Sequence, residues 1–143
     1  MMKKLKWIAL ALLVCGVAGA WYGYSEWNRK PADLTDMKAS MEMSATDLIK
    51  AFSEDETKAN EKYTAKDVIL AVKSKIISID KDAKGLNTIM LGSETDLSSV
   101  SCQMDSLHNA DAEKLQPGQD VTVKGICTGF LTDVILVRCV IQK

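Results

Sequence analysis

The chain has 143 residues, of which 47% are hydrophobic and 6% aromatic, so it suffices for one domain and an apolar N-terminal segment. Its 18 basic and 19 acidic residues are unevenly divided. Residues 1–30 hold five basic residues and one acidic residue, which leaves 13 basic and 18 acidic residues, a net charge of −5, in residues 31–143. This charge argues against long-range attraction of nucleic acid, because such binding depends largely on neutralising phosphates.

Residues 7–25 form an uncharged run that follows three lysines near the N-terminus. A helix of this length spans about 28 Å, close to the ~30 Å thickness of the hydrocarbon layer of a bilayer. Aromatic residues flank the run on both sides, as at membrane interfaces: Trp7, and then Trp21, Tyr22, Tyr24 and Trp27. We therefore predict that residues 1–27 are a single-pass membrane anchor. The basic start predicts that the N-terminus stays in the cytoplasm and that the following domain lies on the other side of the membrane.

Two alternatives stay open for this segment. The tripeptide Ala18-Gly19-Ala20 fits a signal-peptidase site, so residues 1–27 could be a cleaved signal sequence of a secreted protein. Cys15 follows an apolar run that resembles a lipoprotein signal, which would make the chain lipid-anchored. The residue before a lipidated cysteine is normally small, however, and here it is Val14.

A linker and a helix are predicted next. Residues 28–43 contain a proline, mixed charges and three methionines, which is typical of a linker after a membrane segment. Ser44 then has the position of a helix N-cap, with Asp47 three residues later. Residues 45–62 are predicted to be helical, because apolar residues recur near helical spacing: Leu48, Phe52, Ala59 and Tyr63.

Three strands follow the helix in the predicted order. Residues 67–80 are rich in β-branched residues and exceed the length of an average strand. Such a segment suits a bent strand shared by two halves of a small barrel. A polar turn closes a hairpin to a second strand at residues 87–91, and a third strand is predicted at residues 99–104.

The last third of the chain predicts a short helix and a closing hairpin. Residues 106–115 form a helix or turn that ends at Pro117-Gly118. Residues 120–129 and 133–141 each place alternate apolar residues on one face of a strand. The order of strand, strand, strand, helix, strand, strand is that of an OB-fold, a five-stranded Greek-key barrel. We therefore predict a mainly β protein with an OB-fold domain at residues 44–143, a leading helix and an N-terminal transmembrane helix.

These residues resemble a known family. The predicted helix with Phe52 and Tyr63, then Cys102, the run Gly118-Gln119-Asp120-Val121-Thr122-Val123-Lys124-Gly125-Ile126-Cys127-Thr128-Gly129 and Cys139 are similar to the tRNA anticodon-binding-like OB-fold family of bacterial envelope proteins. The resemblance covers about residues 44–143. It implies an OB-fold in the cell envelope, anchored in a bacterial inner membrane with the domain facing the periplasm. It also suggests nucleic acid as a ligand class, although a fold does not by itself determine a function.

The cysteines of the domain suggest a disulfide, which a domain outside the cytoplasm permits. A hairpin turn centred on Asp133 places Cys127 opposite Cys139, at a separation that a disulfide can bridge. We predict this bridge, whose loop of about 13 residues is worth roughly 3 kcal/mol. The alternative is a bridge between Cys102 and Cys139, because the third and fifth strands of an OB barrel are neighbours.

No residue pattern predicts catalysis, a cofactor or a metal site. The sequence has no Cys-x-x-Cys spacing, and its one histidine, His108, lies in a predicted polar loop. It has no Gly-rich phosphate loop, and its serines lack the context of a nucleophile elbow. We therefore predict a binding protein that is not an enzyme.

Two functions remain as hypotheses. The first is a membrane-anchored binding module of unknown ligand, with a positively charged ligand face made of four lysines: Lys73, Lys75, Lys84 and Lys124. Nucleic acid is one such ligand by family resemblance, but the predicted central strands lack the aromatic residues on which bases stack. The second is an envelope domain that binds a protein or peptide and does not bind nucleic acid.

Overall fold

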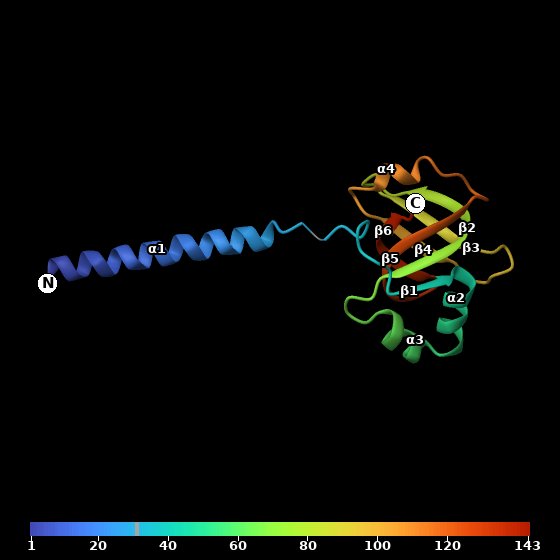
Figure 1. The fold of residues 1–143 in the computed structure, drawn as a ribbon, viewed down its shortest axis with the longest axis horizontal. Helices are drawn as coiled ribbons and strands as arrows, with labels where there is room; N and C mark the ends of the chain where they lie inside the picture. Colours follow the sequence, from blue (N-terminus) through green and yellow to red (C-terminus); the bar gives the residue numbers. More distant parts are fainter. Residues whose placement is uncertain (31) are drawn as a thin grey trace. The chain divides into compact units, whose positions relative to one another are not determined.

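The computed structural model describes residues 1–30 and 32–143 and divides into two compact units, residues 1–32 and 33–143. The first unit is helix α1, Met2–Trp27, drawn in blue in Figure 1. All of its side chains are exposed, and the helix is long and apolar enough to cross a membrane. The predicted N-terminal helix is therefore confirmed as a candidate membrane span.

The second unit is built on a closed five-stranded barrel (Figure 1). The strands pair in the order β2-β3-β4-β6-β5, and β5 pairs again with β2 to close the cylinder. The β4–β6 pair is parallel and the other four pairs are antiparallel. This arrangement confirms the predicted OB-fold. The strands are β2 (Leu70–Lys81), β3 (Asn87–Gly92), β4 (Val100–Met104), β5 (Asp120–Phe130) and β6 (Val134–Ile141).

Strand β2 is the bent strand that the sequence predicts. Its first half pairs with β5, from Leu70 to Lys75, and its second half pairs with β3, from Lys75 to Lys81. The pairing with β3 shifts register at Ile77, where one extra residue bends the strand. One strand can therefore serve two neighbours, which closes the barrel.

Strand β1, Met41–Ser44, was not predicted. It pairs in parallel with the first half of β2, on the edge that β3 leaves free. The chain just before it is also attached, because the Ser40 backbone N–H donates to the Ile69 carbonyl at 2.7 Å. The predicted linker at residues 28–43 therefore differs from the structure, in which residues 33–43 belong to the barrel unit.

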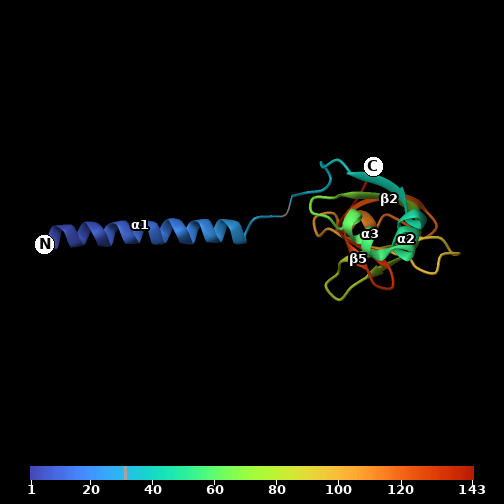
Figure 2. The same ribbon diagram turned by 90° about the horizontal axis from the view of Figure 1, so that it is seen from below.

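Helices cover both ends of the barrel. Helices α2 (Ala45–Glu54) and α3 (Glu56–Tyr63) lie across one end, as the view from below shows (Figure 2). The short helix α4 (Asn109–Ala112) lies at the opposite end (Figure 1). Ser44 caps α2 as predicted, since its hydroxyl accepts from the Asp47 N–H at 3.1 Å. The single predicted helix is broken at Asp55, whose extended backbone ends α2 and whose carboxylate caps α3.

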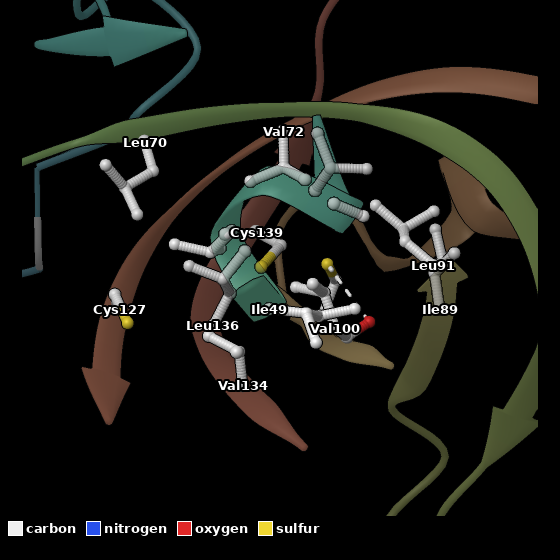
Figure 3. Packing of buried hydrophobic residues seen from close by; sticks show 14 of the residues in the cluster. Ile49, Leu70, Val72, Ile89, Leu91, Val100, Cys127, Val134, Leu136 and Cys139 are labelled. Atoms are coloured by element: carbon white, nitrogen blue, oxygen red, sulfur yellow. Dashed lines mark hydrogen bonds between the residues drawn. The ribbon is translucent and has the colours of Figure 1, made fainter. Parts of the chain in front are cut away.

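The core fills the barrel with aliphatic side chains from every strand (Figure 3). Helix α2 closes the end of this core with Leu48, Ile49 and Phe52. The largest fully buried strand residues of this core are Leu70, Val72, Ile89, Leu91, Val100, Cys102, Val123, Val134 and Leu136.

Candidate binding surfaces

The outer face of β2, β3 and β4 is the surface that OB-folds use for extended ligands. Its side chains follow from the strand register, because inward and outward residues alternate and paired residues share a face. Met90 pairs with Ser78 and Ser101, and Thr88 pairs with Asp80 and Gln103. Two exposed lysines of β2, Lys73 and Lys75, lie on the half of the strand that pairs with β5. The part of the face made by the six paired residues above has no aromatic ring and no basic side chain. It therefore lacks both kinds of group that hold single-stranded nucleic acid.

The structure places the four lysines of the predicted ligand face in three different settings. Lys73 and Lys75 are exposed on β2, where their pairing partners on β5 are Thr122 and Asp120. Lys84 is exposed in the turn that follows the far end of β2. Lys73 and Lys75 are two positions apart and share one face of β2, whereas Lys84 lies beyond the far end of the strand.

The fourth lysine, Lys124, is buried and therefore not part of a ligand face. It is only 7% exposed. Its ammonium donates to the backbone carbonyls of Thr35 at 2.8 Å and Met37 at 2.9 Å. The sequence predicts this residue on a ligand face because of its positive charge, and alternation along β5 points its side chain out of the barrel. The side chain does not enter the barrel, but an earlier segment of the chain covers it and keeps it from solvent.

A groove of about 760 Å³ lies at the bend of β2. Its charged side chains are one lysine, Lys75, and two acids, Glu94 and Asp120. Ile77, the extra residue of the bulge, is 42% exposed and lies against Gly92, where no side chain stands in its way. A groove with mixed charge and an exposed aliphatic side chain suits a polypeptide better than a polyanion.

The segment that covers Lys124 is residues 33–40, here called the strap. Leu34 of the strap is 3% exposed and packs with Ile69, Ile126 and Val140 on the outside of the barrel. The sequence gives little sign of this contact, because Leu34 stands alone among polar residues and shows no helical or strand periodicity.

His108 holds the start of the strap. Its Nε2 lies 2.8 Å from Asp33 Oδ2 and 3.1 Å from Thr35 Oγ1, while its Nδ1 lies 3.8 Å from Asp111 Oδ2. The sequence predicted no role for this histidine. Its partner, Asp33, is 75 positions away in the chain, so no local pattern could reveal the contact.

The strap contact of Asp33 predicts a response to acid. The backbone N–H and the hydroxyl of Thr35, together with His108, lower the pKa of Asp33 from 3.8 to about 2. A carboxylate whose pKa is lower in the folded state stabilises that state above its unfolded pKa, and the effect is lost as the pH falls through the folded pKa. We expect the strap attachment to weaken mainly between pH 4 and pH 2, and to be unchanged between pH 7 and pH 6.

An NMR titration of the Thr35 backbone amide measures this effect, because that N–H donates to Asp33 Oδ1 at 2.8 Å. The signal should shift with a midpoint near pH 2. In the control Asp33→Asn the shift should disappear. A midpoint near 4 in the unaltered chain would show that the contacts to Thr35 and His108 do not hold the carboxylate.

The predicted disulfide between Cys127 and Cys139 is wrong. Cys127 faces Leu136 across the hairpin, three residues before Cys139. The register of β5 and β6 shifts on both sides of this pair, and these bulges displace the facing residues from those of a regular hairpin. All four cysteines are free thiols. Figure 3 shows the labelled Cys127 and Cys139 on separate strands with their sulfur atoms apart.

The thiols of the barrel are structural in their setting. Cys102 and Cys139 come from the neighbouring strands β4 and β6 and contact each other in the core. Burial raises the pKa of both Cys127 and Cys139, and the Cys102 thiol raises that of Cys139 further, so both remain protonated at neutral pH. A protonated thiol is a poor nucleophile and a poor metal ligand. Among residues 1–30 and 32–143, no three His, Cys, Asp or Glu side chains are grouped to hold a metal ion.

Comparisons with known proteins agree with the barrel. A crystal structure of a Klebsiella pneumoniae lipoprotein, proposed to bind nucleic acid, has a TM-score of 0.63 and 19% identity, over 80% of this chain and 100% of that one. A chain of the Stn1–Ten1 complex of S. pombe has a TM-score of 0.39 and 21% identity, over 48% of this chain and 52% of that one. The second likeness is too low to support an argument. No curated protein matches the chain.

The family resemblance seen in the sequence is confirmed by a model of that family, described as tRNA_anti-like, which matches residues 1–141. The match includes the apolar N-terminal helix and every strand of the barrel. Because the match extends over almost the whole chain and the barrel is an OB-fold, this chain belongs to the tRNA_anti-like family.

Proposed function

We propose that this chain is a membrane-tethered OB-fold module that binds a segment of another envelope protein and does not bind nucleic acid. The observation that carries the proposal is the patch of six paired residues on the outer face of β2, β3 and β4, namely Ser78, Asp80, Thr88, Met90, Ser101 and Gln103. This patch has hydroxyl, amide, carboxylate and methionine side chains where stacking rings and cations would be needed. The net charge of −5 in residues 31–143 adds repulsion from phosphate. The groove beside Lys75 offers the mixed chemistry that suits a polypeptide.

The same proposal places the barrel on the periplasmic side of the inner membrane, with α1 as its anchor. The lysines before α1 support this orientation, because basic residues stay on the cytoplasmic side. The proposed role is binding without catalysis. Histidine and cysteine often act in catalysis. Here the His108 ring contacts the Asp33 carboxylate, and the raised pKa values of Cys127 and Cys139 keep both thiols protonated.

Nucleic-acid binding is the second candidate, supported by the role proposed for the Klebsiella lipoprotein. Polarisation of labelled single-stranded DNA and RNA, measured with the full chain from 25 to 200 mM salt, separates the two candidates. We expect no saturable signal up to several hundred micromolar protein. Binding that is tight at low salt and falls steeply with added salt would overturn the proposal.

A positive arm of the experiment uses a photo-crosslinking residue in place of Met90, at the centre of the outer face. We expect crosslinked products in membranes that survive nuclease and are destroyed by protease. The matched control carries the same group in place of Lys58, which is exposed on α3 and away from this face. Products that nuclease destroys, or equal yields at both positions, would contradict a protein partner on this face.

A further inference from the structure

The strap lies on the barrel in the manner of a bound peptide. Three kinds of contact hold it. His108 holds the Asp33 carboxylate at 2.8 Å, an apolar patch on the barrel receives Leu34, and Lys124 donates to two backbone carbonyls of the strap. The contact with His108 favours an acidic side chain, and the apolar patch favours an aliphatic one. The contact from Lys124 accepts any residue, because it is made to the main chain.

The surface is larger than the strap that covers it. Beside Thr35, a groove of about 400 Å³ stays open, and it continues over the ends of β5 and β6. Its lining includes His108, Asp111, Lys124 and Ile141, so the two groups that grip the strap also border the open space. A ligand longer or bulkier than the strap therefore has room to make contacts that the strap does not make.

The strap is attached separately from the barrel core. Leu34, Ile69, Val140 and Ile126 form a small cluster of their own, distinct from the core inside the barrel. Segments with few buried apolar contacts open at a lower free energy than the core of the same domain. Release of the strap would uncover Lys124 and the apolar patch while leaving the barrel strands paired.

We propose that the surface of β5 and β6 beneath the strap is a binding surface for an extended partner segment with an acidic residue followed by an aliphatic one, and that the strap is its internal competitor. This inference goes beyond the proposed function, because it concerns a second surface of the barrel and the chemistry of the segment that would bind there. The complementarity is direct, since the Lys124 ammonium faces two carbonyl oxygens of the bound segment and the His108 ring lies within hydrogen-bond distance of its carboxylate. Competition is effective because a segment of the same chain is present at a millimolar effective concentration.

The test uses the full chain in nanodiscs, and its probe is a synthetic peptide of residues 32–40, Ala-Asp-Leu-Thr-Asp-Met-Lys-Ala-Ser. The double substitution Asp33→Asn with Leu34→Ser in the chain removes the carboxylate and the aliphatic anchor of the strap. We expect the peptide to shift the amide signals of Lys124 and Ile126 in this variant, and to bind the unaltered chain at least ten-fold more weakly. A peptide with serine in place of its leucine should not bind the variant.

Amide hydrogen exchange shows whether the strap has been released. The Ser40 N–H, bonded to the Ile69 carbonyl at 2.7 Å, should exchange at least ten-fold faster in the variant, whereas the amides of β3 and β4 stay protected. Asp36→Asn is the matched control, because Asp36 is exposed and neighbours the strap contacts without making them. If the double substitution disturbs β3 and β4, Lys124→Met serves as the second variant and should release the strap in the same way.

Three results would overturn this inference. They are a released strap with no peptide binding, equal binding by the variant and the unaltered chain, and a strap that stays protected after its anchors are removed. Each of them leaves the proposed function standing, because protein binding at the outer face of β2, β3 and β4 does not depend on the strap. Salt-sensitive binding of nucleic acid would overturn the proposed function instead.

Discussion

Phe52→Ala should lower the free energy of unfolding of the barrel unit by about 3–5 kcal/mol, the cost typical of removing a buried aromatic ring. Phe52 is 2% exposed and closes the end of the barrel from α2. Its ring centroid lies 6.0 Å from that of Tyr63 on α3 and 5.9 Å from that of Phe130 on β5. The substitution therefore leaves a cavity at the point where both helices meet the barrel. Aromatic contacts that add to the burial are lost with it.

Urea denaturation followed by far-ultraviolet circular dichroism measures this change in the full chain. Phe52→Leu should cost less, because it keeps most of the apolar volume. Lys50→Ala is the matched control on the same helix: its exposed ion pair with Glu54 is 3.7 Å long and should change stability by no more than about 0.5 kcal/mol. If Phe52→Ala and Lys50→Ala proved equally mild, α2 would not be part of the cooperative unit.

Gly125→Ala should also destabilise the barrel, by about 1–3 kcal/mol, as expected when a methyl group is forced into a packed core. A Cβ at this position would lie 2.7 Å from Cys139 Sγ and 3.3 Å from the Val137 carbonyl oxygen. Cys139 is 0% exposed, so its sulfur has no open space into which it could move. The glycine is therefore required by the close approach of β5 and β6 at this point.

A double-mutant cycle identifies the cause of that cost. Cys139→Ala removes the sulfur that the new methyl group meets, so Gly125→Ala should cost less in a Cys139→Ala background than in the unaltered chain. Cys127→Ala is the matched control. Cys127 is also a buried thiol, but it lies on β5, and none of its atoms is among those nearest the added Cβ. There the two costs should add to within about 0.5 kcal/mol. Additivity in both backgrounds would mean that the sulfur contact is not the source of the effect.

The barrel strands could be predicted because their signals are local. Residues 67–80 and 133–141 were expected as strands from β-branched residues and alternation, and β2 and β6 occupy nearly the same positions. The Ser44 cap was predicted for a similar reason, since its partner Asp47 is three residues away. The break at Asp55 was missed because the apolar stripe continues through it, while its cap geometry depends on a backbone conformation that the sequence does not display.

The predicted disulfide and the predicted lysine face differ from the structure for another reason. Facing residues in a hairpin follow from the register, and the register of β5 and β6 depends on bulges that form only when the barrel closes. The four lysines were grouped because each was expected on an outer surface. Lys73 and Lys75 share one face of β2, but Lys84 lies in the turn beyond its far end, and a segment almost 90 positions earlier in the chain covers Lys124.

The sequence by itself determined the apolar N-terminal helix, the order of the strands and the family. The signals for these features are periodicity, turn residues and a run of family-like residues, and all of them involve residues close together in the chain. Only the tertiary structure decided that residues 33–40 are a strap, that His108 holds Asp33, and that Lys124 is a buried donor. These contacts join residues more than 70 positions apart, and each depends on where the closed barrel places its outer faces. A surface made by such contacts has no linear pattern, which is why the fold could be predicted from the sequence and the binding surfaces could not.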